Sequence, residues 1–357
     1  MAEADRRPAA QGARDALNLR ALKGLERLYA RTERWQDLLE VLQVQYDVVT
    51  TERERITILT QLAGMWEESF LKLDRAAECH EKILEIDPMH EGALNALARL
   101  YRQLQQWDRL IETYERHINA TPDRAEKVRV YKALGETYAR DLNDLDRAVD
   151  AYLNVLSIDD QNVDALDALT RIYEKRGDQA SALEMMEQLA RLVSDPARQV
   201  DLLYRSGRIL DRDLGDRMSA LDKYQMALDL DPGHLPSLGA MRLIQVDSGD
   251  WLAAAKLYEQ EASYQKSPRV VAELLVELGN LYEHRLDEHA RAVQVWEAAL
   301  KQDPDSEGAA IPLVAHYRRS ERFAEAFPLL EMLVKRSGKR EPHEQHQLAF
   351  ELGEAAS

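Results

Sequence analysis

The chain has 357 residues, of which 45% are hydrophobic and 31% are charged, a composition that excludes disordered and collagen-like sequences. The net charge of −17 opposes binding to the phosphates of nucleic acids and to anionic lipids. The single cysteine, Cys79, excludes a disulfide framework and a four-cysteine zinc site. No apolar run is long enough for a membrane span, and residues 1–20 lack the apolar block of a secretory signal. We therefore expect a cytoplasmic protein without membrane insertion.

Residues 1–14 are rich in Ala and Arg and are expected to form a flexible N-terminal tail. After this tail, small residues recur with a step of 72 residues, at Ala63, Gly135, Gly207 and Gly279. A second set of positions, offset by about half a step, also recurs at this interval: Tyr29, Tyr101, Tyr173, Gln245 and Tyr317. Because the two sets interleave, we predict an array of nine similar units over residues 15–342.

Each unit is predicted to form two α-helices joined by a short turn. Within residues 94–101, apolar residues have the i, i+3, i+4, i+7 spacing that places them on one helix face: Leu94, Leu97, Ala98 and Tyr101. The turns contain Gly177-Asp178 and Gly249-Asp250, since glycine accepts turn conformations and aspartate caps the next helix. The second helix is expected to end at an Asp-Pro pair, because the residue before proline leaves the helical region. These pairs are Asp87-Pro88, Asp195-Pro196, Asp231-Pro232 and Asp303-Pro304.

The units resemble tetratricopeptide repeats. The residues that carry the resemblance most clearly follow the family's leucine-glycine, tyrosine, alanine, aromatic, alanine and proline pattern: Leu278, Gly279, Tyr282, Ala292, Trp296, Ala299 and Pro304. The resemblance covers residues 15–342 and implies an all-α fold, a tetratricopeptide-type α-solenoid in which antiparallel helix pairs form a right-handed superhelix. One set of units departs from the pattern, with a larger residue at the small position: Glu26, Thr170, Arg242 and Val314.

The recurrent small residues are expected to let two helix backbones approach closely. Glycine costs about 1 kcal/mol relative to alanine inside a helix, so its recurrence indicates a packing gain that offsets this cost. In an array of this kind each hairpin buries its apolar stripe against its neighbours, and the end units need a polar outer face.

Residues 343–357 are expected to form an unfinished or capping C-terminal helix. Glu351-Leu352-Gly353 repeats the triplet Glu277-Leu278-Gly279, and the chain then stops without a second helix. Two interpretations stay open, a solvating helix that closes the array and a cut end of a longer repeat protein. Exposed apolar surface at this end would also allow self-association with another copy.

No catalytic or metal site is predicted. Cys79 and His80 are sequence neighbours, whose side chains diverge on a helix, and His80 occupies a packing position of the repeat. His343 and His346 have the spacing for one metal ion, but no third ligand accompanies them. The sequence has no glycine-rich phosphate loop and no paired catalytic carboxylates. We expect no enzyme activity, no cofactor and no metal.

A charged stripe is predicted on the face opposite the packing face, where the resemblance places the concave groove that binds partner peptides. Fifteen basic and eleven acidic residues give this stripe an excess of four positive charges in an acidic chain. The basic residues are the candidate partner-binding residues: Arg20, Lys23, Arg27, Arg31, Arg99, Arg102, Arg129, Lys132, Arg140, Arg171, Lys175, Arg208, Arg212, Arg318 and Arg319.

Two explanations of the stripe are weighed. It is either a solvated face with internal ion pairs or a groove for an acidic peptide, whose carboxylates arginine binds through paired hydrogen bonds. The Lys-and-Asn clamp with which family members bind a chaperone tail is not reproduced, since Arg27 follows Lys23 and Glu136 follows Lys132.

The sequence therefore predicts a protein–protein interaction scaffold or adaptor, with a protein or peptide partner and no nucleic acid. A regulatory or recruiting arm of a larger enzyme and a self-assembling repeat module are the alternatives. The partner, the pathway and the oligomeric state are not specified by these patterns.

Overall fold

The structure is a computed structural model that describes residues 6–336 and residue 353, with side chains from residue 18 onward. Two compact units divide the chain, residues 1–172 and residues 173–357, and the division falls within α9 (Val163–Arg176). The first unit begins with these helices: α1 (Arg6–Arg31), α2 (Trp35–Val48), α3 (Glu52–Glu68), α4 (Leu73–Ile86), α5 (Glu91–Gln103), α6 (Trp107–Ala120), α7 (Arg124–Glu136), the π-helical turn η1 (Thr137–Asp141) and α8 (Leu145–Ile158). The second unit continues with α10 (Gln179–Leu192), α11 (Pro196–Arg212), α12 (Arg217–Leu230), α13 (Leu235–Ser248), α14 (Trp251–Tyr264), α15 (Pro268–His284), α16 (His289–Gln302), α17 (Glu307–Arg319) and α18 (Phe323–Arg336).

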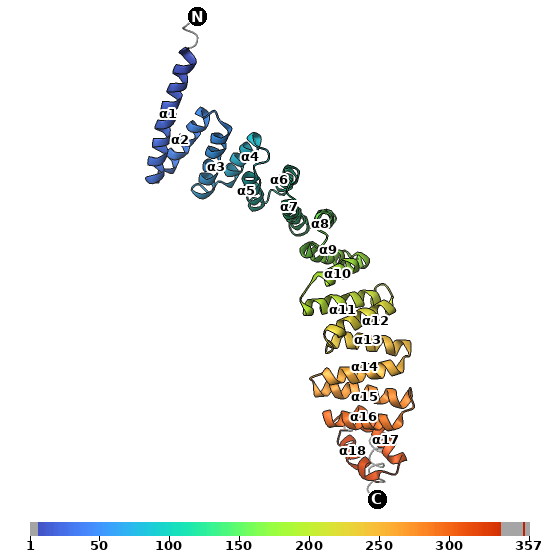
Figure 1. Cartoon of the computed structure of the whole chain (residues 1–357). Helices are drawn as coiled ribbons and strands as arrows, with labels where there is room; N and C mark the ends of the chain where they lie inside the picture. Colours follow the sequence, from blue (N-terminus) through green and yellow to red (C-terminus); the bar gives the residue numbers. More distant parts are fainter. Residues whose placement is uncertain (1–5, 337–352, 354–357) are drawn as a thin grey trace. The chain divides into compact units, whose positions relative to one another are not determined.

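Residues 6–336 contain eighteen α-helices and no β-strand. Successive helices pair as hairpins, α1 with α2 through α7 with α8 in the first unit and α11 with α12 through α17 with α18 in the second (Figure 1). Inside each unit a helix packs mainly against the helices that precede and follow it in the sequence. The predicted all-α repeat array is therefore confirmed. The right-handed winding and the division at residues 15 and 342 stay predictions. None of the helices in the described range combines the length and apolar composition that a membrane crossing requires.

Each hairpin loop turns at one residue with a left-handed backbone. These residues have φ between 53° and 77° and form two series with the 72-residue step. One series is Glu33, Gln105, Gly177, Gly249 and Glu321, and the other is Leu71, Asn143, Gly215 and Asp287. Glycine and asparagine tolerate this conformation readily, whereas Leu71 adopts it at a steric cost.

Aspartate caps start the second helix of four hairpins. The carboxylates of Asp144, Asp178, Asp216 and Asp250 each accept a hydrogen bond of 3.1 Å from the backbone N–H three residues later. The prediction that aspartate after the turn caps the next helix is confirmed at Asp178 and Asp250.

One Asp-Pro pair has a role other than the predicted one. Helices α4, α12 and α16 end directly before their Asp-Pro pairs, as expected. Asp195-Pro196, however, begins α11, because Pro196 occupies the first helical position and Asp195 accepts a 3.3 Å hydrogen bond from the N–H of Ala197. Proline suits that position, because the first helical residue needs no N–H and proline has none.

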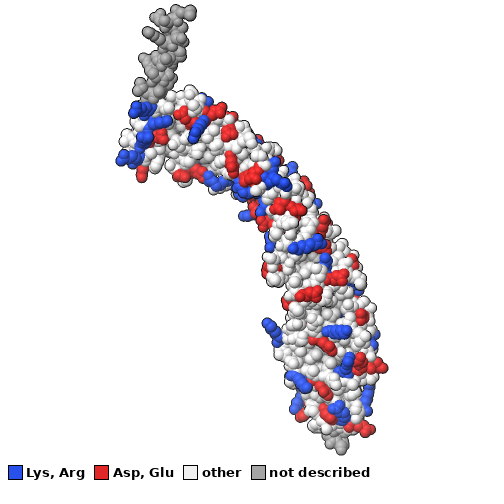
Figure 2. Space-filling model, viewed as in Figure 1, with Lys and Arg blue, Asp and Glu red and all other residues white. Residues whose placement is uncertain are grey.

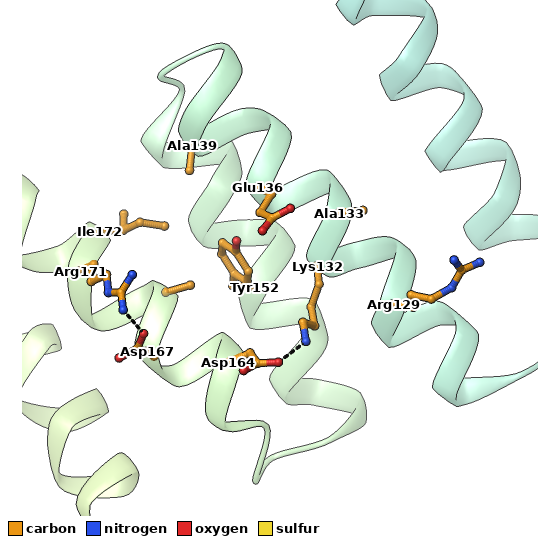
Figure 3. A pocket seen from close by; sticks show the side chains of 11 residues that line it. Arg129, Lys132, Ala133, Glu136, Ala139, Tyr152, Asp164, Asp167, Arg171 and Ile172 are labelled. Atoms are coloured by element: carbon orange, nitrogen blue, oxygen red, sulfur yellow. Dashed lines mark hydrogen bonds and ion pairs between the residues drawn. The ribbon is translucent and has the colours of Figure 1, made fainter. Parts of the chain in front are cut away.

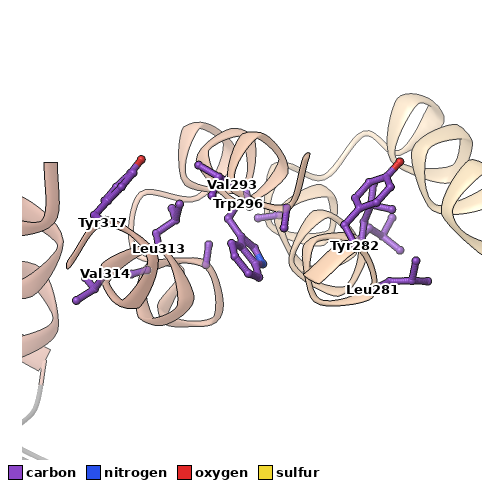
Figure 4. Close-up of a cluster of buried hydrophobic side chains, with 14 of the residues drawn as sticks. Leu281, Tyr282, Val293, Trp296, Leu313, Val314 and Tyr317 are labelled. Atoms are coloured by element: carbon purple, nitrogen blue, oxygen red, sulfur yellow. The ribbon is translucent and has the colours of Figure 1, made fainter. Parts of the chain in front are cut away.

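The recurrent small residues make room for an aromatic ring of the second helix. A Cβ atom at Gly207 would lie 2.5 Å from Cε1 of Tyr224, and one at Gly135 would lie 2.8 Å from Cε2 of Tyr152. At Gly279 the indole of Trp296 fills this space, inside the buried cluster of the second unit (Figure 4). The expectation that two backbones meet at these positions is therefore wrong, because a ring lies between them.

The first member of this series differs in a consistent way. Ala63 stands where the others have glycine, and the residue that corresponds to Tyr152 and Tyr224 is His80. Both residues are buried. The smaller imidazole ring of His80 thus accompanies Ala63, the one residue of the series that carries a methyl group. The combined volume of the two side chains therefore stays similar along the series.

Two of the four larger residues of the other set have polar partners nineteen positions further along the chain. Glu26 accepts a 2.9 Å hydrogen bond from Gln45, and Arg242 forms a 2.7 Å ion pair with Glu261. The partly buried charge of Arg242 is thus neutralised by Glu261, and that of Glu26 is stabilised by a hydrogen bond.

Hydrogen bonds also join successive hairpins. The hydroxyl of Tyr101 donates to Glu81 of the preceding hairpin over 2.9 Å, and that of Tyr317 donates to Glu297 over 2.6 Å. Burial raises the pKa of both tyrosines to about 12, so they keep their protons at neutral pH. Neighbouring hairpins are therefore tied by hydrogen bonds as well as by apolar packing.

The N-terminal end of the array differs from the expected tail, and the C-terminal end is not described. Helix α1 begins at Arg6, inside the segment predicted as a tail, because Ala, Arg and Leu are strong helix formers. The predicted C-terminal helix of residues 343–357 lies outside the described residues, apart from residue 353.

We predict that Gly207→Ala lowers the free energy of unfolding by about 1–3 kcal/mol, because the added methyl group overlaps Tyr224. Adding Tyr224→His should recover part of this loss, since it reproduces the Ala63 and His80 combination. Urea unfolding of the two single variants and the double variant measures the coupling. Gly64→Ala is the matched control, since nothing lies within 4 Å of its added Cβ, and we expect it to stabilise. Additive effects at 207 and 224 would contradict the assigned packing.

Candidate functional site

The fifteen predicted partner-binding residues all lie on the first helices of hairpins or on the turn η1. Arg20, Lys23, Arg27 and Arg31 are on α1, Arg99 and Arg102 on α5, and Arg129 and Lys132 on α7. Arg140 is on η1, Arg171 and Lys175 are on α9, Arg208 and Arg212 on α11, and Arg318 and Arg319 on α17. Figure 2 shows Lys and Arg side chains interspersed with Asp and Glu over both units, with basic side chains gathered near α5 to α7.

Several of these basic residues are already paired. Arg99 of α5 binds Glu67 of α3 through two hydrogen bonds, and Lys132 of α7 pairs with Asp164 of α9. Arg171 pairs with Asp167 over 2.6 Å. The interpretation of the stripe as a solvated face with internal ion pairs therefore holds for part of it, and such exposed pairs add little stability.

Three pockets occur in the first unit, and all have the same construction. Each lies between the first helices of two successive hairpins, with residues of the intervening second helix in its lining. We call them the α1–α3 pocket, of about 210 Å³, the α5–α7 pocket, of about 480 Å³, and the α7–α9 pocket, of about 590 Å³. Seven of the fifteen predicted residues line them: Lys23, Arg27, Arg99, Arg102, Arg129, Lys132 and Arg171.

The α7–α9 pocket is balanced in charge. Its lining includes Arg129, Lys132 and Arg171 together with three acids, Glu136, Asp164 and Asp167. Figure 3 shows Lys132 directed at Asp164 and Arg171 at Asp167, with the ring of Tyr152 among these charged side chains. The α1–α3 pocket is balanced too, with Lys23 and Arg27 against Glu26 and Glu54.

The α5–α7 pocket is the basic one among the three. Three arginines and no carboxylate line it. The complete lining is Asn95, Ala98, Arg99, Arg102, Gln103, Tyr114, His117, Arg129, Val130 and Ala133. Arg129 and Ala133 also line the α7–α9 pocket, so the two pockets adjoin. His117 is buried, and burial lowers its pKa, so it is neutral at neutral pH.

Arg102 has a different environment from Arg99 and Arg129. Its Nη2 donates to the hydroxyl of Tyr114 over 3.3 Å and to Oγ1 of Thr137 over 3.0 Å. Thr137 is fully buried, donates to the carbonyl of Ala133 over 2.8 Å and is the first residue of the π-helical turn η1. Polar side chains from α5, α6 and η1 thus converge at one corner of the α5–α7 pocket.

Sequence reasoning missed Tyr114 and Thr137, although the repeat contains a signal for Thr137. Residues one or two steps of 72 away from Thr137 are apolar and buried: Met65, Ile209 and Leu281. A polar residue at a position that is apolar and buried in the other repeats departs from the rule that core positions hold apolar residues.

The other groups considered at the sequence level behave as packing residues. Cys79 is buried, and burial raises its pKa to about 11, so the thiolate nucleophile is not formed at neutral pH. Burial also lowers the pKa of His80. Among the described residues, no group of three or more His, Cys, Asp or Glu side chains is placed to hold a metal ion. His343 and His346 lie outside the described residues.

Sequence models described as tetratricopeptide repeat match five segments of the chain. One model matches residues 21–56, 93–128 and 165–200, a second matches residues 273–306, and a third matches residues 128–162. The first three segments start 72 residues apart, which is the step of the repeat. No curated protein sequence shows significant similarity to the chain.

Solved structures similar to the chain include three helical repeat proteins. MamA protein is 23% identical, with a TM-score of 0.37 over 51% of this chain and 94% of that one. YrrB, described as a TPR protein with an unusual peptide-binding site, is 20% identical, with a TM-score of 0.34 over 51% and 90%. The C-terminal part of a TPR repeat-containing protein from Cytophaga hutchinsonii is 16% identical, with a TM-score of 0.40 over 71% and 97%. The hairpins and the sequence models, and not these superpositions, establish the fold.

We predict that Glu67→Gln makes the stability of the chain less dependent on acid pH. Hydrogen bonds from Arg99 lower the pKa of Glu67 below its usual value of 4.5. The stabilisation is therefore complete above that usual value and is lost as the pH falls through the lowered pKa of the folded state. The difference should stay below about 1 kcal/mol, because the pair is partly exposed.

Urea unfolding at a series of pH values measures this effect. Glu68→Gln is the control, since Glu68 is exposed and has no ion pair within the described part of the chain. Identical pH profiles for the unchanged chain and Glu67→Gln would show that the Arg99 pair contributes nothing to stability.

Proposed function

Because the chain belongs to the tetratricopeptide repeat family, we propose that it is a protein-interaction scaffold that holds a segment of a partner protein on the first helices of its first unit. The adjoining α5–α7 and α7–α9 pockets support this proposal, because together they offer one extended surface across three hairpins. The described residues that line the two pockets include arginine, carboxylate, amide, aromatic and small apolar side chains, which suit peptide recognition. The function requires no catalysis, and we propose a cytoplasmic location.

We further propose that the partner segment is acidic where it meets the α5–α7 pocket. The observation that carries this proposal is the lining of that pocket, which has three arginines and no carboxylate. The balanced α7–α9 pocket next to it suits a segment of mixed polarity. A partner whose acidic residues meet the first pocket gains electrostatic complementarity, which favours specificity and the rate of association.

Self-association is a second candidate function, favoured by an observation on α1. Leu25 and Leu28 of α1 are 39% and 53% exposed, whereas the corresponding Leu97 and Leu100 of α5 are fully buried. The face that α5 packs against its preceding hairpin is thus uncovered on α1 in the described structure. Another copy of the chain would find an apolar surface there. The predicted association through residues 343–357 lies outside the described residues.

Charge reversal of the α5–α7 pocket tests the scaffold proposal. We expect Arg99→Glu combined with Arg102→Glu to reduce the recovery of bound proteins from native lysate by about tenfold or more, since a repulsive pair replaces an attractive one. Quantitative mass spectrometry of the captured proteins is the measurement. Arg208→Glu with Arg212→Glu is the matched control, because these α11 residues are exposed and line none of the three pockets.

Melting curves must accompany the capture, since the carboxylate introduced at position 99 would face Glu67 in the double variant. Arg99→Gln with Arg102→Gln avoids that repulsion and should lose capture while melting close to the unchanged chain. Capture that is equal for the unchanged chain, the charge-reversal variant and the glutamine variant would refute the proposed binding surface.

A further inference from the structure

The polar corner of the α5–α7 pocket has a construction that peptide binding in general does not explain. We call Arg102, Tyr114 and Thr137 the Arg102 cluster. Tyr114 is 7% exposed and Thr137 is 0% exposed, so two hydroxyl groups are buried beside one guanidinium. Burying hydroxyls costs free energy unless they form hydrogen bonds, and here both accept from Arg102. The cluster is therefore held together by Arg102 itself.

The Arg102 cluster occurs once among the described hairpins. The positions one step of 72 residues from Tyr114 carry Leu42 and Met186, and those from Thr137 carry Met65 and Ile209. Ala30 and Glu174 stand one step from Arg102. Other hairpins of the array thus form without this combination of polar residues. Packing of the hairpin alone therefore does not require the Arg102 cluster.

The charges of the pocket are neutralised unequally. Arg99 is bound by Glu67, and Arg129 is bound by Glu126, with its Nε donating to Oε2 over 2.8 Å. Within the part of the chain that the structure describes, no carboxylate lies at ion-pair distance from Arg102, whose side chain donates to the two hydroxyls. One positive charge is therefore left without a counter-charge at this corner.

Hydrogen-bond donors also stay uncommitted in the pocket. Both bonds of Arg102 use Nη2, which leaves Nη1 and Nε without acceptors among the described residues. Asn95 accepts from Arg129 over 2.9 Å with its carbonyl oxygen, and its amide N–H groups have no partner there. Arg102 and Asn95 are exposed, so these donors face solvent and can exchange water for an acceptor with one negative charge.

We propose that the α5–α7 pocket is a subsite for a single carboxylate, the side chain of one Asp or Glu in the bound partner segment, which pairs with Arg102 and takes further hydrogen bonds from Asn95. This inference rests on the proposed scaffold function and names the residue type that the pocket selects. A phosphate group carries nearly two charges at neutral pH. It would leave an excess negative charge beside Glu67 and Glu126, so the subsite selects carboxylate over phosphate.

The hydroxyls of Tyr114 and Thr137 act as positioning groups in this subsite. They hold Nη2 of Arg102 on the inner side, which leaves Nη1 and Nε as the donors that a ligand can use. These two nitrogens do not share an edge, so each can give a carboxylate one charge-assisted hydrogen bond. Lysine at this position would keep the charge and lose this fixed planar arrangement of donors.

A library of short peptides, acetylated and amidated at their ends, tests the subsite. One position at a time is fixed as Glu, Asp, Gln or phosphoserine, and binding to the full chain is measured by fluorescence polarisation. We expect Glu or Asp to exceed Gln by about tenfold at one position, which corresponds to one charge-assisted hydrogen-bonded pair. Arg102→Gln should abolish this preference, and Arg102→Lys should restore it only in part.

Tyr114→Phe is the second variant, because it removes one hydroxyl and keeps the buried ring. It should weaken the preference for Glu over Gln without changing the binding of the Gln peptides. Arg269→Gln on α15, an exposed residue outside the three pockets, is the matched control and should behave as the unchanged chain. Melting curves establish that each variant is folded before its binding is compared.

The outcomes separate the two proposals. Peptides that bind with equal affinity for Glu and Gln, or a Glu preference that survives in Arg102→Gln, would overturn the subsite and leave the scaffold function standing. A preference for phosphoserine over Glu, or for a free terminal carboxylate over an internal Glu, would also overturn the single side-chain assignment. If no peptide of the library binds the unchanged chain, both the subsite and the proposed peptide surface fail.

Discussion

The packing of a second-helix ring onto a small residue of the first helix is the contact on which the array depends. It occurs at Gly135, Gly207 and Gly279, where no Cβ atom would fit beneath the ring. A ring in this position fixes the distance between the two helices of the hairpin and fills the space between their backbones. Each hairpin then packs its remaining apolar face against its neighbours in the sequence, so stability accumulates along the chain and not in one central core.

This construction also explains where the pockets arise. Two successive first helices are separated by a second helix, and the space between them is lined from three sides. The repeat supplies the scaffold of the three pockets in the first unit, and single substitutions give each pocket its chemistry. Tyr114 and Thr137 change one pocket from an apolar corner into a polar one that holds Arg102, while the backbone keeps the pattern of the other hairpins apart from the turn η1. Fold and recognition are thus specified by different residues of the same hairpin.

Much of the fold follows from the sequence, and less of the site does. The 72-residue step predicts the helical hairpins and their turns, since Gly177 and Asp178 have strong local preferences. The sequence predicts a helix end at Asp195-Pro196, because the motif alone does not distinguish a stop from an N-terminal cap. The basic residues of the stripe lie on the first helices and on the turn η1, but their neutralisation depends on which acids lie on the neighbouring first helices. Neither that pairing nor the burial of Thr137 follows from spacing along one helix, because both are set by the contacts between hairpins.

Native-state hydrogen exchange at the amides of the small residues tests the central claim most directly. If the ring contact holds each hairpin together, the amides of Gly135, Gly207 and Gly279 exchange only through cooperative opening of their hairpins and are among the slowest in the chain. The left-handed loop residue Gly215, whose amide donates no backbone hydrogen bond among the described residues, should exchange rapidly and provides the internal reference. Exchange at the three helical glycines as fast as at Gly215 would contradict the account, because the contact would then contribute nothing to the closed hairpin.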